Sequence, residues 1–301
     1  MTFARHAGLW PVMLTPFTHE GEVDYSSLER LIDWYEKKGV NGLFADCQSS
    51  EIFFLSLRER VELASFIKMH AHVPVIASGH VSNAFSDQLE ELKAIAATGV
   101  DALILITNRL VHSGRQKESI MPCVKQIMHE IPDIPLGFYE CPYPFKRLIT
   151  LDELKECAES GRFAFMKDTC CDIETIRQRL TALSGTDFGL YNANTTTCLE
   201  SIRAGASGFS GVMLNFHPEL YRWMLDHMSD SKADMVQSFL TVFSEIERQC
   251  YPVNAKFYQT EIEKVFSDPY TRSVPAEGLT ETFKMEVYHL NIAAKWLLDQ
   301  L

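Results

Sequence analysis

The sequence lacks the features that mark membrane proteins and nucleic-acid-binding proteins. No apolar run approaches the roughly 20 residues that a helix needs to span a bilayer, and residues 1–9 lack the apolar core of a signal peptide. Basic residues are few: 28 lysines and arginines stand against 40 acidic residues, and the net charge of −12 opposes binding to phosphates. We therefore expect a cytoplasmic protein with no nucleic acid and no membrane as partner.

The sequence also lacks the cysteine and histidine spacings of metal sites. The eight cysteines are single residues apart from Cys170-Cys171, and no CxxC pair or His/Cys cluster has zinc-site spacing. In a 301-residue chain, such cysteines are most simply free thiols in a reducing compartment. We expect no metal and no cofactor, and we interpret Cys170-Cys171 as two small apolar residues.

What the sequence does contain is a regular alternation of short apolar runs and amphipathic segments. The runs predict strands at the start of 9–17 and over 42–47, 74–78, 102–106, 135–139, 163–167, 188–191 and 208–213. The segments predict helices over 26–38, 56–70, 84–97, 118–130, 151–159, 173–183, 197–204 and 218–228. Continuously apolar strands separated by helices are typical of a buried parallel sheet.

Eight such units predict an α/β fold, a (β/α)8 TIM barrel. The alternative is an open doubly wound sheet, which usually has fewer strands and a glycine-rich first turn; residues 15–21 contain no GxGxxG. Beyond residue 230 the pattern predicts only helices, over 234–249, 255–266 and 281–298. We therefore expect a barrel over residues 1–230 and a C-terminal helical extension over 231–301 that packs on it.

Lys167 ends the sixth predicted strand, in the apolar stretch 163–169. Its position is unusual, because lysine is almost never fully buried without a partner. One interpretation is a desolvated amine with a lowered pKa that attacks a carbonyl and forms a Schiff base. The other is an ordinary lysine that reaches solvent or pairs with Asp168. The C-terminal ends of the strands are where a TIM barrel holds its active site.

Other polar side chains follow neighbouring strands at the same end of the predicted barrel. Tyr139 could relay the proton that carbonyl addition requires. The turn Gln48-Ser49-Ser50 offers backbone N–H groups that could hold a carboxylate. Taken singly, each residue is explained by packing or by turn capping, but the whole set favours imine chemistry.

Several short motifs, in order along the chain, resemble a known family. They are Leu14-Thr-Pro-Phe17, Ser49-Ser-Glu51, Phe138-Tyr139 with Pro142, and Met166-Lys-Asp-Thr169. Together with the spacing of 28 residues between Tyr139 and Lys167, they make the sequence similar to the dihydrodipicolinate synthase/N-acetylneuraminate lyase family of class I Schiff-base aldolases. The resemblance extends from Leu9 through the C-terminal helices.

The resemblance implies a lyase that acts on pyruvate or a 2-keto-3-deoxy acid through a lysine Schiff base, by aldol cleavage or condensation or by dehydration. It implies three catalytic residues: Lys167 forms the Schiff base, Tyr139 relays protons, and Ser49 links to Tyr139 and binds the substrate carboxylate. It also implies a homotetramer built as a dimer of dimers. The further substrate-binding residues that we predict are Ser50, Gln48, Thr15, Thr169, Ser210 and Asn194.

The sequence departs from the family in several places, two of which lie in the motifs named above or close to them. Cys47-Gln-Ser-Ser-Glu51 stands where the family has a GTTGE-like turn, so both glycines, which often supply a positive φ, are replaced. Pro144 stands where dihydrodipicolinate synthases carry an arginine for their aldehyde substrate, with Lys146 and Arg147 beyond it. The missing arginine counts against dihydrodipicolinate synthase proper, which is one alternative function. A non-catalytic barrel that senses a keto acid is another, and the roles of His80 and His112 stay open.

Overall fold

Eight parallel strands form the centre of the computed structural model, which describes residues 7–111, 114 and 117–301. The strands are β1 Gly8–Leu9, β2 Leu43–Ala45, β3 Val75–Ala77, β4 Ala102–Ile106, β5 Leu136–Tyr139, β6 Phe163–Asp168, β7 Gly189–Asn192 and β8 Gly208–Phe209. Their order in the sheet is β1-β8-β7-β6-β5-β4-β3-β2. The ring closes beyond β1, where Val12 pairs with Phe44 and the Met13 amide donates to the Phe44 carbonyl at 3.0 Å. The predicted TIM barrel is confirmed.

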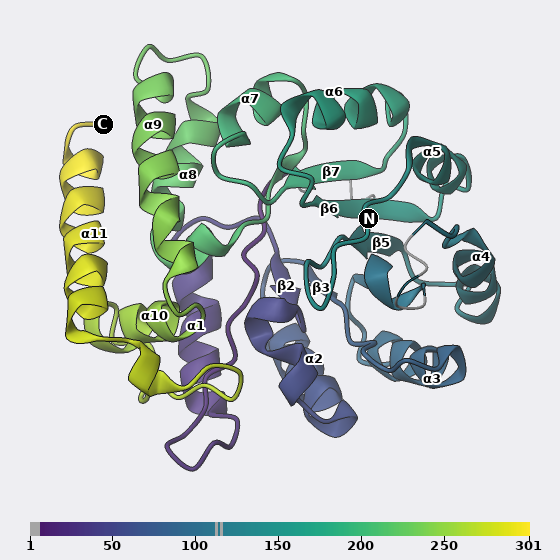
Figure 1. Ribbon diagram of the computed structural model, residues 1–301, viewed down its shortest axis with the longest axis horizontal. Helices are drawn as coiled ribbons and strands as arrows, with labels where there is room; N and C mark the ends of the chain where they lie inside the picture. The colour runs from purple at the N-terminus through teal and green to yellow at the C-terminus, as the bar shows by residue number, and fades with distance from the viewer. Residues whose placement is uncertain (1–6, 112–113, 115–116) are drawn as a thin grey trace.

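Helices follow the strands and cover the outside of the barrel (Figure 1). They are α1 Tyr25–Lys37, α2 Leu57–His70, α3 Phe85–Ala96, α4 Met121–Glu130, α5 Leu151–Glu159, α6 Ile173–Ala182, α7 Cys198–Arg203 and α8 Pro218–Asp226. Local sequence sets their starts: Ser56 accepts a hydrogen bond from the Glu59 amide, and the Glu59 carboxylate accepts from the Ser56 amide at 2.8 Å. Within the described residues, no helix is long and apolar enough to cross a membrane.

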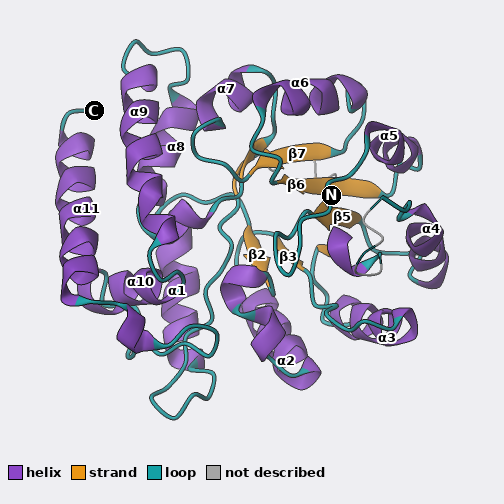
Figure 2. Cartoon of the chain, in the orientation of Figure 1, coloured by secondary structure: helices purple, strands orange, loops and turns teal. Residues whose placement is uncertain are grey.

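The C-terminal part of the chain adds helices beside α8, as predicted. They are α9 Ala233–Phe243, α10 Val253–Phe257 and α11 Glu281–Asp299, and Figure 2 shows α9 and α11 standing together at one side of the barrel. The helix predicted over 234–249 is interrupted, because the chain tightens into a 3-10 turn over Ser244–Arg248. The helix predicted over 255–266 is a short helix followed by a π-turn, Tyr258–Ile262. The division of the chain near residue 230 remains a prediction.

Aromatic side chains fill the barrel interior. Phe165 stacks on Tyr191 with ring centroids 4.1 Å apart, and Trp10 meets Phe165 edge-on at 5.2 Å. A second, larger core lies between the strands and the surrounding helices. The predicted eighth strand is shorter than expected, since the chain turns into a 3-10 segment at Val212–Asn215.

The register of β5 and β6 decides which side chains meet at the end of the barrel. Tyr139 pairs with Lys167 across the two strands. Successive side chains of a strand point to opposite faces, so the next residues, Glu140 and Asp168, point away from the interior and meet Arg179 of α6. One strand pair therefore presents Tyr139 and Lys167 inward and two carboxylates outward.

Candidate active site

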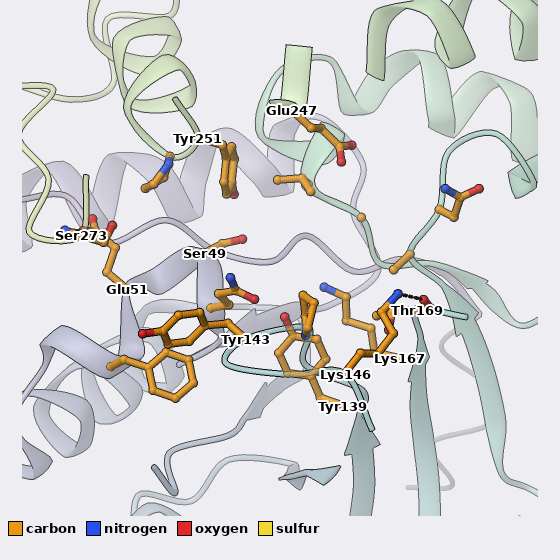
Figure 3. Close-up of a pocket in the computed structure, with 18 of the residues that line it drawn as sticks. Ser49, Glu51, Tyr139, Tyr143, Lys146, Lys167, Thr169, Glu247, Tyr251 and Ser273 are labelled. Atoms are coloured by element: carbon orange, nitrogen blue, oxygen red, sulfur yellow. Dashed lines mark hydrogen bonds between the residues drawn. The ribbon is translucent and has the colours of Figure 1, made fainter. Parts of the chain in front are cut away.

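A cavity of about 500 Å³ opens at the C-terminal ends of the strands (Figure 3). Six of the residues predicted from the sequence line it: Gln48, Ser49, Tyr139, Lys167, Thr169 and Asn194. Side chains that the sequence analysis did not assign to a site complete the wall, among them Lys146, Glu247, Tyr251, Ser273 and Val274. A cavity of this size suits a small-molecule substrate.

Lys167 projects from β6 into this cavity and is 5% exposed. Among the described residues it has no ion-pair partner; its ammonium lies over the Tyr139 ring, 4.6 Å from the centroid. Asp168 does not pair with it, because that carboxylate faces Arg179. Burial lowers the pKa of Lys167, and the nearby thiols of Cys47 and Cys141 and the carboxyl group of Glu247 act in the opposite direction. A larger fraction of neutral amine follows, and the neutral amine is the nucleophile.

Tyr139 lies beside Lys167, and its hydroxyl hydrogen-bonds the Cys141 side chain. Burial raises the pKa of Tyr139 well above 10, and the thiols of Cys141 and Cys47 raise it further. The phenol therefore stays protonated at neutral pH and is suited to donate or relay a proton, not to act as a free base. The Cys141 thiol in turn donates to the Gln48 side chain at 3.5 Å.

Ser49 has a different partner from the one that we expected. Its side chain hydrogen-bonds the Tyr251 hydroxyl, whose pKa burial raises well above 10, and Asn215 also donates to that hydroxyl at 3.1 Å. Figure 3 shows Tyr251 directed at Ser49 from the far wall of the cavity. The predicted link from Ser49 to Tyr139 is thus replaced by a link to the C-terminal part of the chain.

The turn after β2 needs no glycine at the two replaced positions. Cys47 is extended, with φ −112°, and Ser50 closes a 3-10 turn over Gln48–Ser50. The left-handed conformation falls instead on Asp46, with φ 48°, and on Glu51, with φ 59°. The buried carboxylate of Glu51 accepts hydrogen bonds from Lys256 Nζ at 2.5 Å and from the Ser273 amide at 2.6 Å, which holds this strained residue in place.

Three of the predicted substrate-binding residues are not among the described residues that line the cavity, and their substrate contacts stay predictions. Thr15 donates to the Ser50 carbonyl at 2.9 Å and supports the turn from behind. Ser50 donates to the Met13 carbonyl at 2.7 Å, and its amide is used by the Cys47 carbonyl, so that amide is not available to a carboxylate. Ser210 is fully buried at the end of β8.

Thr169 and Lys146 form one wall of the cavity. The Thr169 hydroxyl donates to the Glu140 carbonyl at 2.7 Å. The Thr169 backbone carbonyl accepts a hydrogen bond from Lys146 Nζ at 2.7 Å, which is the contact dashed in Figure 3. Arg147, the other basic residue after Pro144, points elsewhere and binds Glu153 in a buried ion pair. Lys146 is therefore the cation that the β5–α5 loop brings to the cavity.

Glu247 and Tyr251 are two of the cavity residues that were not predicted from the sequence. Both lie near the 3-10 turn that follows α9. The sequence predicts helix over 234–249, and a continuous helix gives no sign that one of its residues will face a barrel. Tyr251 lies five residues before Lys256, and neither Tyr251 nor Glu247 belongs to a recognisable sequence motif.

His80 is part of the scaffold. One ring nitrogen accepts from the Ile106 amide at 2.6 Å and the other contacts Gln88 at 3.1 Å; burial lowers its pKa to about 4. His112 lies outside the described residues. Within the residues that are described, no group of three or more His, Cys, Asp or Glu side chains is arranged to hold a metal ion.

Comparisons with known proteins agree with the geometry. A family model described as the Dihydrodipicolinate synthetase family matches residues 5–265. The 4-hydroxy-tetrahydrodipicolinate synthase of Shewanella sp. strain ANA-3 is 27% identical over 228 residues, 75% of this chain and 76% of the relative. A dihydrodipicolinate synthase from Bacillus anthracis has a TM-score of 0.85 at 19% identity, covering 96% of this chain and 98% of its own. YagE, a prophage protein of E. coli K12 solved with pyruvate, has a TM-score of 0.82 at 21% identity, with coverage of 96% and 98%.

Proposed function

The chain belongs to the dihydrodipicolinate synthetase family, a family of lyases, and on that premise we propose that it is a class I lyase. Lys167 forms a Schiff base with the ketone of pyruvate or of a 2-keto-3-deoxy acid. The observation that carries the proposal is the environment of Lys167: a buried amine with a lowered pKa and no ion-pair partner among the described residues, directed into the cavity. The pyruvate bound to YagE agrees with this substrate class.

The proposed reaction begins when the neutral amine of Lys167 attacks the ketone carbon. The oxygen of the resulting carbinolamine takes up a proton and leaves as water, and Tyr139 is the group that delivers that proton. The protonated imine then accepts the electron pair of a bond that breaks at the adjacent carbon, which gives an enamine. In aldol cleavage this is the bond to the next carbon, whose hydroxyl loses its proton so that an aldehyde leaves. In dehydration it is a C–H bond, whose proton goes to a base, and the enamine then expels the hydroxyl group of the next carbon, which leaves as water after taking up a proton.

Dihydrodipicolinate synthase proper is the alternative favoured by the names of the curated relatives. Its support in this chain is Lys146, a cation on the cavity wall only two residues beyond Pro144. An ammonium is a point charge and lacks the planar fork with which arginine grips a carboxylate. Turnover of aspartate semialdehyde with pyruvate, measured beside a panel of 2-keto-3-deoxy acids, separates the two activities. Turnover of none of them would favour the non-catalytic sensor.

The test of the Schiff base is chemical trapping. Incubation with pyruvate and borohydride should add one pyruvyl group to Lys167, and Lys167→Ala should abolish the adduct. Lys146 is the matched control, because it is the second lysine on the same cavity wall: peptide mapping should find it unmodified. An adduct on Lys146 instead of Lys167, or no adduct, contradicts the mechanism.

We also propose a homotetramer, a dimer of dimers, in keeping with the resemblance to the family. The support in this chain is an exposed apolar stripe on α11, made of Met285, Tyr288, Ile292 and Trp296. A contiguous exposed apolar surface typically marks a protein–protein contact.

A further inference from the structure

Glu247 is the acidic side chain of the cavity that still needs a partner. It lies in the 3-10 turn Ser244–Arg248, and Figure 3 shows it on the wall opposite Tyr139 and Lys167. The side chain is half-buried. Among the described residues, no donor hydrogen-bonds its carboxyl group and no cation pairs with it, so the group is open to a ligand in the cavity.

The neighbouring acidic residues Glu51 and Glu245, unlike Glu247, have hydrogen-bond or ion-pair partners. Glu51, also on the cavity wall, is satisfied by Lys256 and by the amides of Arg272 and Ser273. Glu245, two residues before Glu247, is exposed and pairs with Arg248 at 2.9 Å, so the cation of this turn is already engaged. Of the two carboxyl groups that line the cavity among the described residues, Glu51 is thus paired and Glu247 is not.

The charged and titratable groups around Glu247 come from several elements. They are Lys167 of β6, Cys171 after it, Tyr221 of α8, and Tyr251, Glu245 and Arg248 from the same stretch as Glu247. Burial raises the pKa of Glu247 to about 7, with Lys167 acting in the opposite direction. Near neutral pH the group can therefore both accept and donate hydrogen bonds, as hydroxyl groups require of a partner.

We propose that Glu247 binds a hydroxyl group on the part of the substrate beyond the imine carbon, so that the enzyme selects a polyhydroxylated, sugar-like fragment over an apolar or anionic one. The inference rests on the proposed function, which fixes the ketone carbon at Lys167. The rest of the chain must then extend through the cavity, whose far wall carries Glu247. An apolar fragment would leave that carboxyl group unpaired, and an anionic fragment would be repelled by its charged form.

The test uses borohydride trapping on Lys167 with three six-carbon 2-oxo acids that differ beyond the third carbon. They are 2-keto-3-deoxygluconate, which is hydroxylated, 2-oxohexanoate, which is apolar, and 2-oxoadipate, which ends in a second carboxylate. The wild type should reach half-maximal trapping at the lowest concentration with 2-keto-3-deoxygluconate. Glu247→Leu should raise that concentration about tenfold or more, as expected for a lost hydrogen bond to a charged group, and should raise it more for this ligand than for pyruvate.

Glu247→Gln keeps the shape and a hydrogen-bonding group, and should fall between the wild type and Glu247→Leu. Glu245→Leu, in the same turn but paired with Arg248, is the matched control and should leave all four ligands unaffected. An unaltered preference in Glu247→Leu, or an equal loss for pyruvate and the hydroxylated acid, overturns the inference. Absence of any Lys167 adduct in the wild type instead overturns the proposed function, so the two failures are distinguishable.

Discussion

Removal of the Arg179 guanidinium should destabilise the fold strongly, because it would leave two buried carboxylates unpaired. Arg179 is 2% exposed, and Glu140 and Asp168 are fully buried. The guanidinium donates to the two Glu140 oxygens at 2.7 and 3.1 Å, to the Ile149 carbonyl at 3.1 Å and to Asp168. Arg179→Met keeps the length of the side chain but removes every one of these donors.

Breaking a buried pair by removing one partner costs about 3–5 kcal/mol, and Arg179 serves two carboxylates. We therefore expect Arg179→Met to lower the free energy of unfolding by at least about 3 kcal/mol at pH 8. The loss should shrink at lower pH. Burial already raises the pKa of Glu140, and Arg179 opposes that rise; without Arg179 the folded-state pKa increases further. A group whose pKa is raised on folding stabilises the fold when protonated, so the variant recovers stability as the pH falls.

Chemical denaturation at pH 5.5 and pH 8 measures both effects. Arg177→Met is the control: Arg177 lies on the same helix, is 44% exposed, and pairs with Glu174 and Glu200 at the surface. Exposed pairs contribute about 0–1 kcal/mol, so this variant should be nearly as stable as the wild type. Equal losses in the two variants, or a loss in Arg179→Met that does not depend on pH, would refute the reasoning.

Three further outcomes follow from the site and the surface. Tyr139→Phe should lower kcat by about 10²–10⁴-fold while imine formation slows but survives; a variant that keeps more than half of the wild-type kcat would make Tyr139 a packing residue. Ser49→Ala should lose less activity, because Ser49 hydrogen-bonds Tyr251 and not Tyr139, and should weaken binding of the substrate carboxylate, which the KM for pyruvate reports. Light scattering at micromolar concentration should give the mass of a tetramer, and a monomer would contradict the proposed assembly.

The barrel could be predicted because its elements are local. Short apolar runs mark the strands, and caps such as Ser56 mark helix starts. Lys167 and Tyr139 could be predicted for the same reason: each ends a strand, and strand ends meet at one rim. Their contact then follows from the register of β5 and β6.

The remaining part of the candidate site depends on contacts between distant parts of the chain. Tyr251 meets Ser49 across about 200 residues of sequence, and the turn that directs Glu247 interrupts what reads as a continuous helix. Thr15 and Ser210 do not line the cavity for a related reason. Position at a strand end places a residue near the rim, but packing decides whether its side chain faces the cavity or the turn behind it.

Glu51 shows how the two parts of the site are joined. Its carboxylate connects the turn after β2 to Lys256 and to the Ser273 amide, and Ser273 itself lines the cavity. Both Glu51 and Lys256 are buried, so the contact is shielded from solvent and holds the C-terminal segment against the barrel rim. The strands thus fix Lys167 and Tyr139, while the C-terminal segment fixes the opposite wall. Imine formation depends on Lys167 and Tyr139, whereas the fit of the rest of the substrate depends on the wall that the C-terminal segment forms. We therefore expect changes beyond residue 230 to alter substrate choice more than imine formation.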